Sequence, residues 1–388
     1  MLKMIALEKF LEQKPLFYAN IDYDRFPKIY QRIASFFNLP KIIHIVGTNG
    51  KGTTGRFLAQ MLRLQKLHVG HYTSPHILKF NERIWIDDCE IDDASLESAH
   101  RWLFELLNQE EKEALSYFEY TTLLAMRLFS QSCDYVVLEA GLGGEFDATN
   151  VFGKILSIIT PIGYDHEAFL GNTIESIATT KLNSIKTDFI LAKQMFQEVN
   201  LLAENIAKIK NVRSLHTHHL LSKESLQIII QDAQNMGYPA FLCENLITAY
   251  SALTFLGYDA KMKNLDFLSL NGRFQKFLSN VTLDVGHNPL AAQALLEALD
   301  GKKIVLIYNS YADKEYEQIL TLLKPVIKRL EIIDIQSPRA VEMTRLEKVA
   351  KELHLPCSHH EGLREDDEYV VFGSFSVVEA FLRKYREK

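Results

Sequence analysis

A glycine-rich segment between a strand-like run and a helical pattern most constrains how this chain folds. Residues 41–54 read KIIHIVGTNGKGTT, in which the apolar, β-branched run 42–46 leads into the glycines and then into apolar residues at helical spacing. Glycines let backbone amides approach an anion, and the N-terminus of the following helix carries partial positive charge. We therefore expect a phosphate-binding loop, with Lys51 on the β- and γ-phosphates of a nucleotide and Thr53 near Mg²⁺.

The loop departs from the common GxxxxGK[ST] spacing, because Gly52 stands between Lys51 and Thr53. A plain strand-to-helix turn would explain Gly50 and Gly52 but neither the lysine nor the threonine. The phosphate-binding interpretation is favoured for that reason.

Strand-like runs alternate with helical patterns along the whole chain. Predicted strands are 42–46, 68–73, 135–140, 155–161, 188–192, 226–230, 281–285, 303–308, 330–335 and 369–372. Predicted helices are 53–66, 94–109, 119–131, 173–186, 194–209, 244–256, 289–299, 314–325, 342–353 and 375–386. This alternation predicts an α/β protein with parallel sheets that helices cover on both faces.

The length of 388 residues exceeds what one ordinary core supports, so the chain is expected to form two domains. The pattern is interrupted at 268–275, where Asn271 and Gly272 would permit a hinge. We predict a P-loop domain over 1–269 and a smaller α/β domain over 275–388.

Bulk properties exclude several classes of protein. The net charge of −6 argues against non-specific nucleic-acid binding, and no apolar stretch approaches the roughly 20 residues of a membrane helix. The four cysteines are widely separated and form no C-x-x-C pair. We expect a cytoplasmic monomer with reduced thiols.

Two oxygen-bearing side chains end predicted strands and are candidate metal ligands. Glu139 closes the apolar run 135–139, and Ser74 follows the run 68–73. Ligands bind at the carboxyl ends of parallel strands, and Mg²⁺ prefers hard oxygen donors. A capping acid and a turn serine before Pro75 are the alternatives.

Eight motifs, taken in chain order, resemble those of the folylpolyglutamate synthase/dihydrofolate synthase family within the Mur ligase superfamily. They are GTNGKGT at 47–53, YTSPH at 72–76, SYFE at 116–119, LEAGLGGEFDATN at 138–150, DH at 165–166, GRFQ at 272–275, DVGHNP at 284–289 and GSF at 373–375. The resemblance implies an N-terminal P-loop ATPase-like domain and a smaller Rossmann-like C-terminal domain. It also implies an ATP-dependent amide ligase that forms ADP and phosphate.

The resemblance assigns roles to further residues. It places Asn245, Arg273, Asp284 and His287 at ATP, together with the loop residues Gly50, Lys51, Gly52 and Thr53. It places Ser116, Tyr117, Phe118, Glu119, Phe146, Asp147 and Ala148 around a pterin or pteroate group.

It also implies two Mg²⁺ ions, the second at His166, and a carbamylated lysine at Lys181. Neutral lysine and CO₂ form an anionic carbamate, which requires a lowered lysine pKa. The neighbours of Lys181, which read TKLNS over 180–184, differ from the family pattern EKAG. An exposed helix lysine is the alternative.

The predicted function is the ATP-dependent joining of L-glutamate to dihydropteroate, to folates, or to both, through an acyl phosphate. Lys51, His166 and Lys181 are the expected catalytic residues. Two alternatives stay open: a peptidoglycan-precursor amino-acid ligase of the same superfamily, and a P-loop ATPase or switch protein. Motifs 116–119 and 138–150 disfavour the first, and folate- and glutamate-dependent ADP release separates a ligase from the second.

Overall fold

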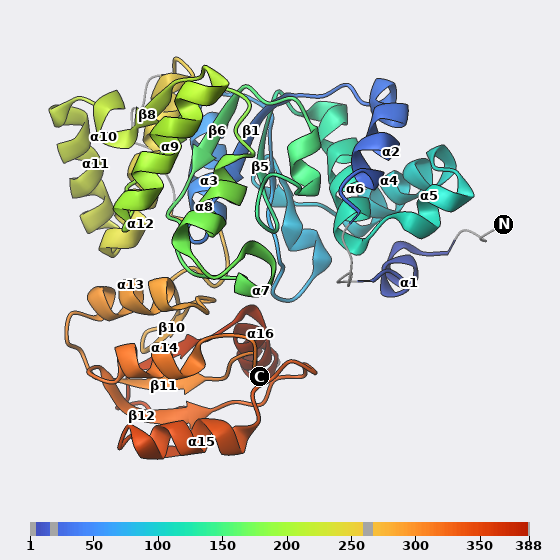
Figure 1. The fold of residues 1–388 in the computed structure, drawn as a ribbon. Helices are drawn as coiled ribbons and strands as arrows, with labels where there is room; N and C mark the ends of the chain where they lie inside the picture. The colour runs from blue at the N-terminus through green and yellow to red at the C-terminus, as the bar shows by residue number, and fades with distance from the viewer. Residues whose placement is uncertain (1–4, 16–21, 259–266, 387–388) are drawn as a thin grey trace.

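The protein is built around two separate sheets, each covered by helices. The computed structural model describes residues 5–15, 22–258 and 267–386. In Figure 1 the first unit, coloured blue to yellow, lies above the second, coloured orange to red. The loops near α7 (Glu167–Leu170) and helix α13 (Pro289–Leu299) lie where the two units meet.

The first sheet is mostly parallel and has the phosphate-loop strand inside it. Its order is β4-β3-β2-β5-β1-β6-β7-β8, and only β3 and β4 run antiparallel to their neighbours. The strands are β1 (Lys41–Val46), β2 (Val69–Tyr72), β3 (Ile84–Ile86), β4 (Cys89–Glu90), β5 (Tyr135–Glu139), β6 (Leu156–Ile159), β7 (Phe189–Leu191) and β8 (Ser214–His216). Because β1 pairs with β5 and β6 on its two sides, the carboxyl ends of three parallel strands meet there.

Strand β1 is buried on both faces, which explains its continuous apolar run. Ile43 and Ile45 pack with α3 (Lys51–Leu64), α11 (Lys223–Asn235) and α12 (Ala240–Phe255). Ile42 and Val46 face the opposite side, in cores that include α6 (Tyr117–Ser132) and α8 (Ile174–Leu182). The remaining helices of this unit are α1 (Leu7–Glu12), α2 (Arg25–Ile33), α4 (Asp93–Leu106), α5 (Gln109–Ala114), α9 (Gln197–Lys210) and α10 (Thr217–Leu220).

The second sheet repeats this layered plan on a smaller scale. Its order is β13-β12-β11-β14-β10-β9, with β9 the antiparallel edge strand. The strands are β9 (Gln275–Leu278), β10 (Val281–Leu283), β11 (Ile304–Tyr308), β12 (Ile327–Ile332), β13 (Cys357–His359) and β14 (Tyr369–Phe372). One face is covered by α13, α14 (Tyr316–Leu323) and α15 (Met343–Glu352), and the other by α16 (Phe375–Arg386).

The loop after β2 joins the two units by apolar contact. Ile77, at 4% exposure, belongs to the core that packs beneath α16 rather than to the core of its own sheet. Gly272 lies between Ile77 and Val285, since an added Cβ would approach them to 2.9 and 2.7 Å. Burial of these groups stabilises the contact, because apolar area is removed from water at about 25 cal/mol per Å².

The α/β fold class with parallel sheets is confirmed, but one predicted strand is wrong. Residues 226–230 lie inside α11, which Ser222 caps by accepting from Ser225 N. The run of three isoleucines suggested β-branched strand packing, yet Ile229 is buried while Ile228 and Ile230 are 50% and 40% exposed. The next buried residue is Ala233, four positions on, which is helical spacing, so tertiary packing decided against local β-propensity.

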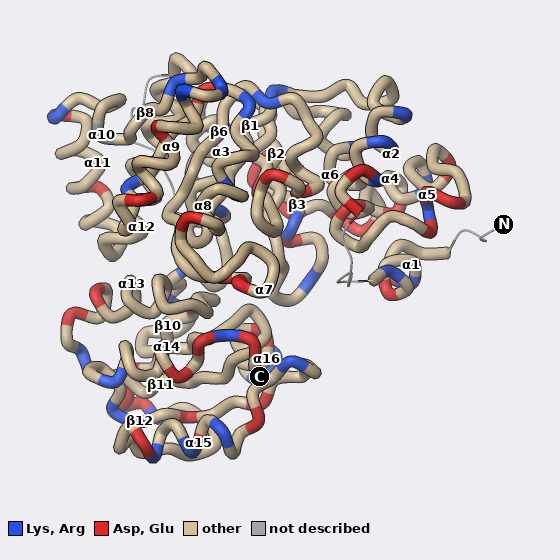
Figure 2. The backbone as a smooth tube through the Cα atoms, viewed as in Figure 1, with Lys and Arg blue, Asp and Glu red and all other residues tan. Residues whose placement is uncertain are grey.

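Charged residues of both signs occur throughout both units. Figure 2 shows Lys and Arg interspersed with Asp and Glu over both units. Within the described ranges, no helix combines the length and the apolarity that crossing a bilayer requires.

The two neighbouring isoleucines of α11 give a direct test of the corrected assignment. Ile229→Ala should lower the free energy of unfolding by about 2–5 kcal/mol, because it empties a buried site. Ile228→Ala should change it by no more than about 0.5 kcal/mol, because its side chain is half exposed. Urea unfolding followed by circular dichroism measures both, and equal losses would contradict the difference in burial that α11 gives these two side chains.

Candidate active site

The loop between β1 and α3 turns the backbone so that the helix N-terminus faces the carboxyl edge of the sheet. Thr48 N and Asn49 N both donate to Pro161 O, at 2.9 and 3.2 Å. Gly50 caps α3 with a φ of +82°, which favours glycine. Lys51 Nζ folds back over the loop and donates to the carbonyls of Gly47 and Thr48 at 3.3 and 3.2 Å. An ammonium and a helix N-terminus thus converge on one small region, as phosphate binding requires.

Asn245 of α12 lies directly against this loop. Its side chain is 7% exposed, and a Cβ added to Gly50 would come within 2.5 Å of Asn245 Oδ1. The close contact explains why glycine is needed at position 50. It also brings an amide, which can both donate and accept, next to the phosphate loop.

Glu139 and Ser74 meet at the carboxyl ends of β5 and β2. Glu139 is 4% exposed, its Oε2 accepts from Ser74 N at 3.4 Å, and its Oε1 lies 3.8 Å from Lys51 Nζ. Burial raises the pKa of Glu139, and the positive charges of Lys51 and Arg273 oppose that rise. The Glu139 carboxylate, the Ser74 hydroxyl and the Thr53 hydroxyl in the first turn of α3 are hard oxygen groups of the kind that suit Mg²⁺, and the loop lysine adds positive charge for a nucleotide phosphate.

The segment that links the two sheets crosses the N-terminus of α3. A Cβ added to Gly52 would meet Leu270 Cδ2 at 3.3 Å, Glu139 Oε2 at 3.4 Å and Arg273 Nη2 at 3.6 Å. The Arg273 guanidinium also stacks on the ring of Phe375, 4.9 Å from its centroid. Arg273 therefore contacts the phosphate loop on one side and the second unit on the other.

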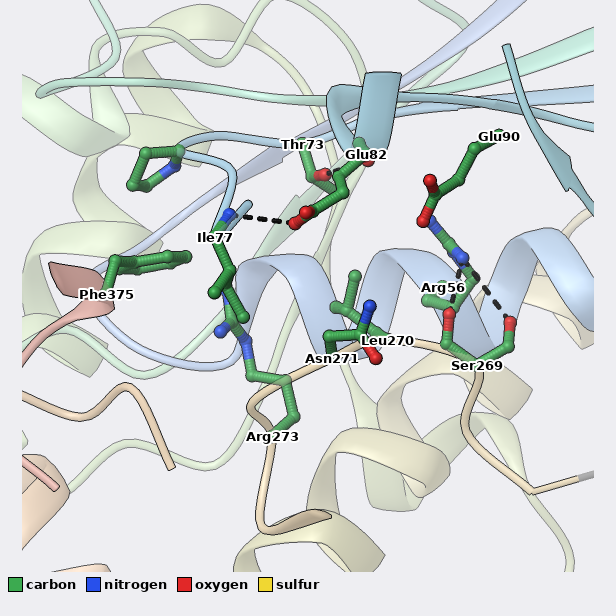
Figure 3. Close-up of a pocket in the computed structure, with 11 residues that line it drawn as sticks. Arg56, Thr73, Ile77, Glu82, Glu90, Ser269, Leu270, Asn271, Arg273 and Phe375 are labelled. Carbon is green, nitrogen blue, oxygen red and sulfur yellow. Dashed lines mark hydrogen bonds between the residues drawn. The ribbon is translucent and has the colours of Figure 1, made fainter. Parts of the chain in front are cut away.

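Arg56 holds this linker against α3. Its Nη1 donates to Ser269 O at 2.6 Å, and its guanidinium lies 4.6 Å from the ring centroid of Trp85. Figure 3 shows the pocket that results, with Arg56 and Ser269 on one side and Arg273 and Phe375 on the other. The pocket is lined by both units and by the linker.

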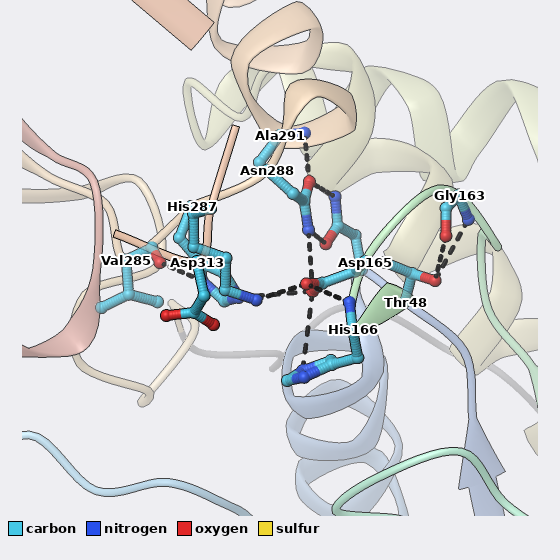
Figure 4. A network of polar contacts seen from close by, with 12 residues as sticks. Thr48, Gly163, Asp165, His166, Val285, His287, Asn288, Ala291 and Asp313 are labelled. Carbon is cyan, nitrogen blue, oxygen red and sulfur yellow. Dashed lines mark hydrogen bonds and ion pairs between the residues drawn. The ribbon is translucent and has the colours of Figure 1, made fainter. Parts of the chain in front are cut away.

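Asp165 joins the two units through a network of polar contacts (Figure 4). Lys314 Nζ donates to its Oδ1, and both side chains are buried, at 7% and 8% exposure. Its Oδ2 lies 3.4 Å from both His287 Nε2 and Asn288 Nδ2, and 3.8 Å from His166 Nε2. Burial would raise the pKa of Asp165, but the hydrogen bond with His287 and the charge of Lys314 hold it well below its usual range.

A reciprocal amide pair reinforces the same contact. Asn288 Nδ2 donates to Asn49 Oδ1 at 2.9 Å, and Asn49 Nδ2 donates back to Asn288 Oδ1 at 3.0 Å. Asn288 Oδ1 also caps α13 by accepting from Ala291 N. The phosphate loop and the first helix of the second unit are therefore bonded to each other directly.

The second unit adds one more carboxylate to the cleft. Asp284 accepts from Gly286 N at 2.8 Å and from Phe274 N at 2.9 Å. Burial raises its pKa, while these backbone bonds and the charge of Arg273 lower it. Asp284 thus fixes the turn that presents His287.

Lys181 is buried beneath the phosphate loop rather than exposed on its helix. Its side chain is 4% exposed, and Nζ donates to Gly47 O at 3.0 Å. Burial lowers the pKa of Lys181 to about 7, and the charge of Lys51 adds to the effect. A large fraction of this amine is therefore neutral near pH 7, as reaction with CO₂ requires.

The motif at 116–119 forms the start of α6. Ser116 Oγ accepts from Glu119 N, and Glu119 Oε2 accepts from Ser116 N, which together make a capping box. Arg25 Nη2 lies 2.8 Å from both carboxylate oxygens of Glu119. Tyr117 lies beneath the guanidinium of Arg83, 5.3 Å from its ring centroid.

Residues 141–148, which we call the substrate loop, lie beside that helix. An added Cβ on Gly141 would come within 2.6 Å of Phe118 Cζ, so glycine is required for the close approach. Phe146 is 55% exposed and its ring centroid lies 4.2 Å from that of Tyr23. Asp147 is buried and caps the short helix η3 (Ala148–Val151) through Thr149 N.

The structure thus brings the predicted residues together in two places. Lys51, Glu139, Arg273 and Asn245 gather at the phosphate loop, whereas Phe118 and Phe146 with their neighbours lie on the face with α6. Sequence reasoning missed Arg25, Tyr23, Asn49 and Lys314 as members of these groups. An amphipathic pattern at 25–33 was the available signal for α2, but nothing local indicated which distant partner each side chain meets.

The fold and the site define a nucleotide-dependent P-loop enzyme. The features that define it are the phosphate loop, the carboxylate at the end of the neighbouring strand, and the second α/β unit that lies against both. No family model matches the chain. Individual relatives do. The dihydrofolate synthase/folylpolyglutamate synthase of Escherichia coli K12 is 30% identical over 84% of this chain and 81% of its own length. That of Haemophilus influenzae is 28% identical over 96% and 95%.

Solved structures of proteins with the same names also resemble the chain. The crystal structure of Helicobacter pylori folylpolyglutamate synthetase is 40% identical, with a TM-score of 0.78 and 98% of each chain covered. A bifunctional folylpolyglutamate synthase/dihydrofolate synthase with Mn, AMPPNP and L-glutamate bound is 25% identical, with a TM-score of 0.81 over 98% of this chain and 97% of that one. The chain belongs to the folylpolyglutamate synthase/dihydrofolate synthase family, and the resemblance drawn from its motifs is confirmed.

The buried ion pair between the units gives a testable expectation. Lys314→Met should loosen their contact, because removing one partner of a buried pair leaves an uncompensated charge at a cost of about 3–5 kcal/mol. Small-angle X-ray scattering should report a larger radius of gyration. Lys276→Met, which removes a 61%-exposed lysine of the second unit, is the control and should leave the scattering unchanged. Identical curves for the two variants would show that the pair does not hold the units together.

Proposed function

We propose that the protein joins L-glutamate to dihydropteroate, to folates, or to both, with hydrolysis of ATP to ADP and phosphate. The observation that carries the proposal is the convergence of Lys51, Glu139 and Arg273 at the phosphate loop, within a member of this family. The relatives that share the fold are named for these two ligase activities.

The chemistry needs positioning and charge neutralisation more than covalent catalysis. A substrate carboxylate oxygen attacks the γ-phosphorus of ATP, giving an acyl phosphate and ADP. The amino nitrogen of glutamate then attacks the acyl carbon, the amine loses a proton, and phosphate leaves as the amide forms.

The residues of the cleft divide these tasks. Lys51 and the N-terminus of α3 neutralise the β- and γ-phosphates, with Gly50, Gly52 and Thr53 around them. Arg273, Asp284 and His287 approach the nucleotide from the linker and the second unit, and Asn245 reads the base. We assign residues 1–269 to the ATP- and folate-binding domain and 275–388 to the domain that completes the cleft.

Ser74 and Glu139 would hold one Mg²⁺ and His166 a second. Bound Mg²⁺ would supply charge stabilisation to the transferring phosphoryl group. The folate-like substrate is assigned to Ser116, Tyr117, Phe118, Glu119, Phe146, Asp147 and Ala148.

The central experiment measures ADP release with Mg-ATP and L-glutamate, comparing dihydropteroate with tetrahydrofolate. We expect both to support turnover, since 146–150 resembles the bifunctional form of the family. Turnover with tetrahydrofolate alone would restrict the protein to polyglutamylation. ADP release that ignores both folate and glutamate would favour an ATPase or switch protein.

Lys51→Ala should lower turnover by at least about 100-fold while the fold survives, because the variant loses the cation that meets the phosphates. Lys208→Ala, at an exposed position of α9, is the matched control and should retain wild-type turnover. Near-normal ligation by a folded Lys51→Ala protein would contradict the P-loop assignment.

Lys181 is proposed to carry a carbamate that ligates the metal near His166. Its burial and its lowered pKa of about 7 support the proposal, because a neutral amine is the form that adds CO₂. Without modification, the protonated form of Lys181 would repel the nearby charge of Lys51. A carbamate would reverse the sign.

Lys181→Ala should therefore be inactive and partly restored by a small added carboxylic acid, whereas Lys51→Ala should not respond to the acid. Depletion of bicarbonate should slow the wild-type enzyme. Intact-mass measurement under gentle conditions should show the added CO₂ directly. A nucleotide- and metal-bound structure with an unmodified Lys181 would rule the carbamate out.

A further inference from the structure

A chain of buried polar side chains runs beneath the substrate loop, and none of its first three members takes part in the steps above. Its members are Lys154, His44 and Thr149, which are 8%, 0% and 1% exposed, and the chain of contacts ends at Asp147. His44 belongs to β1 and points to the face of the sheet that also carries Ile42 and Val46. Buried polar groups of this kind persist only when they are hydrogen-bonded.

In the ammonium form of Lys154, whose pKa burial lowers to about 7, the contacts set the direction of every hydrogen bond in the chain. Lys154 Nζ contacts three acceptors: Asn150 Oδ1, Ser184 O at 3.2 Å and His44 Nδ1 at 3.0 Å. An ammonium has three N–H groups and no acceptor, so each contact uses one of them. His44 Nδ1 is therefore an acceptor, and the single proton of the neutral ring lies on Nε2.

The second half of the chain follows from that tautomer. His44 Nε2 donates to Thr149 Oγ1 at 2.8 Å, and the Thr149 hydroxyl donates to Asp147 Oδ1 at 2.5 Å. Every donor thus points from the lysine towards the carboxylate. Burial, followed by the charge of Lys154, lowers the pKa of His44 well below its usual value, which agrees with a neutral ring.

Asp147 uses its two oxygens to close the substrate loop. Oδ2 accepts from Leu142 N at 2.8 Å near the start of the loop, and Oδ1 accepts from Thr149 N at 2.9 Å just beyond its end. Phe146, next to Asp147, carries the exposed ring that lies against Tyr23. The orientation of one buried carboxylate therefore sets the shape of the loop that presents this ring.

We propose that Lys154, acting through His44 and Thr149, is a positioning residue that orients Asp147 and so sets how tightly the substrate loop binds the fused-ring end of the folate or pteroate substrate. The inference rests on the proposed function for the identity of that ligand. It adds Lys154 and His44 to the residues that determine substrate affinity, although both lie beneath the loop.

The test uses the full chain and measures equilibrium binding of dihydropteroate with Mg-ADP, together with KM and kcat for each substrate. Lys154→Met should weaken dihydropteroate binding by about 10-fold or more, as loss of an outer-shell partner does, and leave the KM for ATP unchanged. Lys210→Met is the matched control, since Lys210 Nζ bonds the nearby carbonyls of Asn183 and Ile185 but is outside the chain of contacts. It should bind dihydropteroate as the wild type does.

Thr149→Val removes one link with little change in side-chain shape, and so serves if Lys154→Met folds poorly. It should weaken dihydropteroate binding to a similar extent. Introducing Lys154→Met into the Thr149→Val protein should then add little, because the link is already broken. Additive losses would show that Lys154 acts by packing or through Asn150, whose Nδ2 donates to Glu145 O, and not through His44 and Thr149, and would overturn the proposal.

A spectroscopic signature tests the hydrogen-bond chain without reference to catalysis. In ¹⁵N-histidine spectra, the His44 signals, identified by their loss in His44→Gln, should show a proton on Nε2 and none on Nδ1. Lys154→Met should shift this tautomer, and Lys210→Met should not. An unchanged tautomer, or equal dihydropteroate affinity of the wild type and Lys154→Met, overturns the inference. A wild-type protein that binds dihydropteroate but never ligates glutamate would overturn the proposed function and leave the positioning role standing.

Discussion

The arrangement of charges around Glu139 is the constraint on which the rest of the site depends. A carboxylate at 4% exposure is costly to bury, and its pKa is raised for that reason. Lys51 comes from the phosphate loop and Arg273 from the linker, so the two compensating charges belong to different parts of the chain. The buried acid therefore fixes the position of the linker as well as the position of the loop lysine.

The contact between the two units also depends on a buried carboxylate whose partners come from distant parts of the chain. Asp165 finds three of its partners, Lys314, His287 and Asn288, in the second unit. The apolar contact of Ile77 with the core beneath α16 stabilises the contact between the units but is not directional. The polar contacts are directional, and they fix how one unit is oriented against the other. Together they bring His287 and Asp284 to the cleft, at a joint whose geometry depends on few side chains.

Much of this was predictable from local pattern, because strand–loop–helix units are encoded by nearby residues. The motif at 47–53 predicted the loop between β1 and α3, and the apolar run before Glu139 predicted β5. Residues 226–230 show the limit: their isoleucines fit a strand locally, and only the packing of Ile229 makes them a helix. Arg25 and Lys154 show another limit, since Glu119 lies 94 residues from the first and His44 lies 110 residues from the second, and no local pattern indicates either contact.

Strand β1 connects the phosphate loop with the loop that the proposed function assigns to the folate-like substrate. Its end becomes the phosphate loop, while His44, in its middle, bonds the support of the substrate loop. A sheet strand that pairs on both sides is among the least deformable parts of a fold, and interiors packed to crystal density transmit small shifts. In the function proposed above, a single strand would therefore set the distance between the γ-phosphate and the substrate carboxylate. In-line phosphoryl transfer depends on such fixed geometry more than on any covalent group the protein could add.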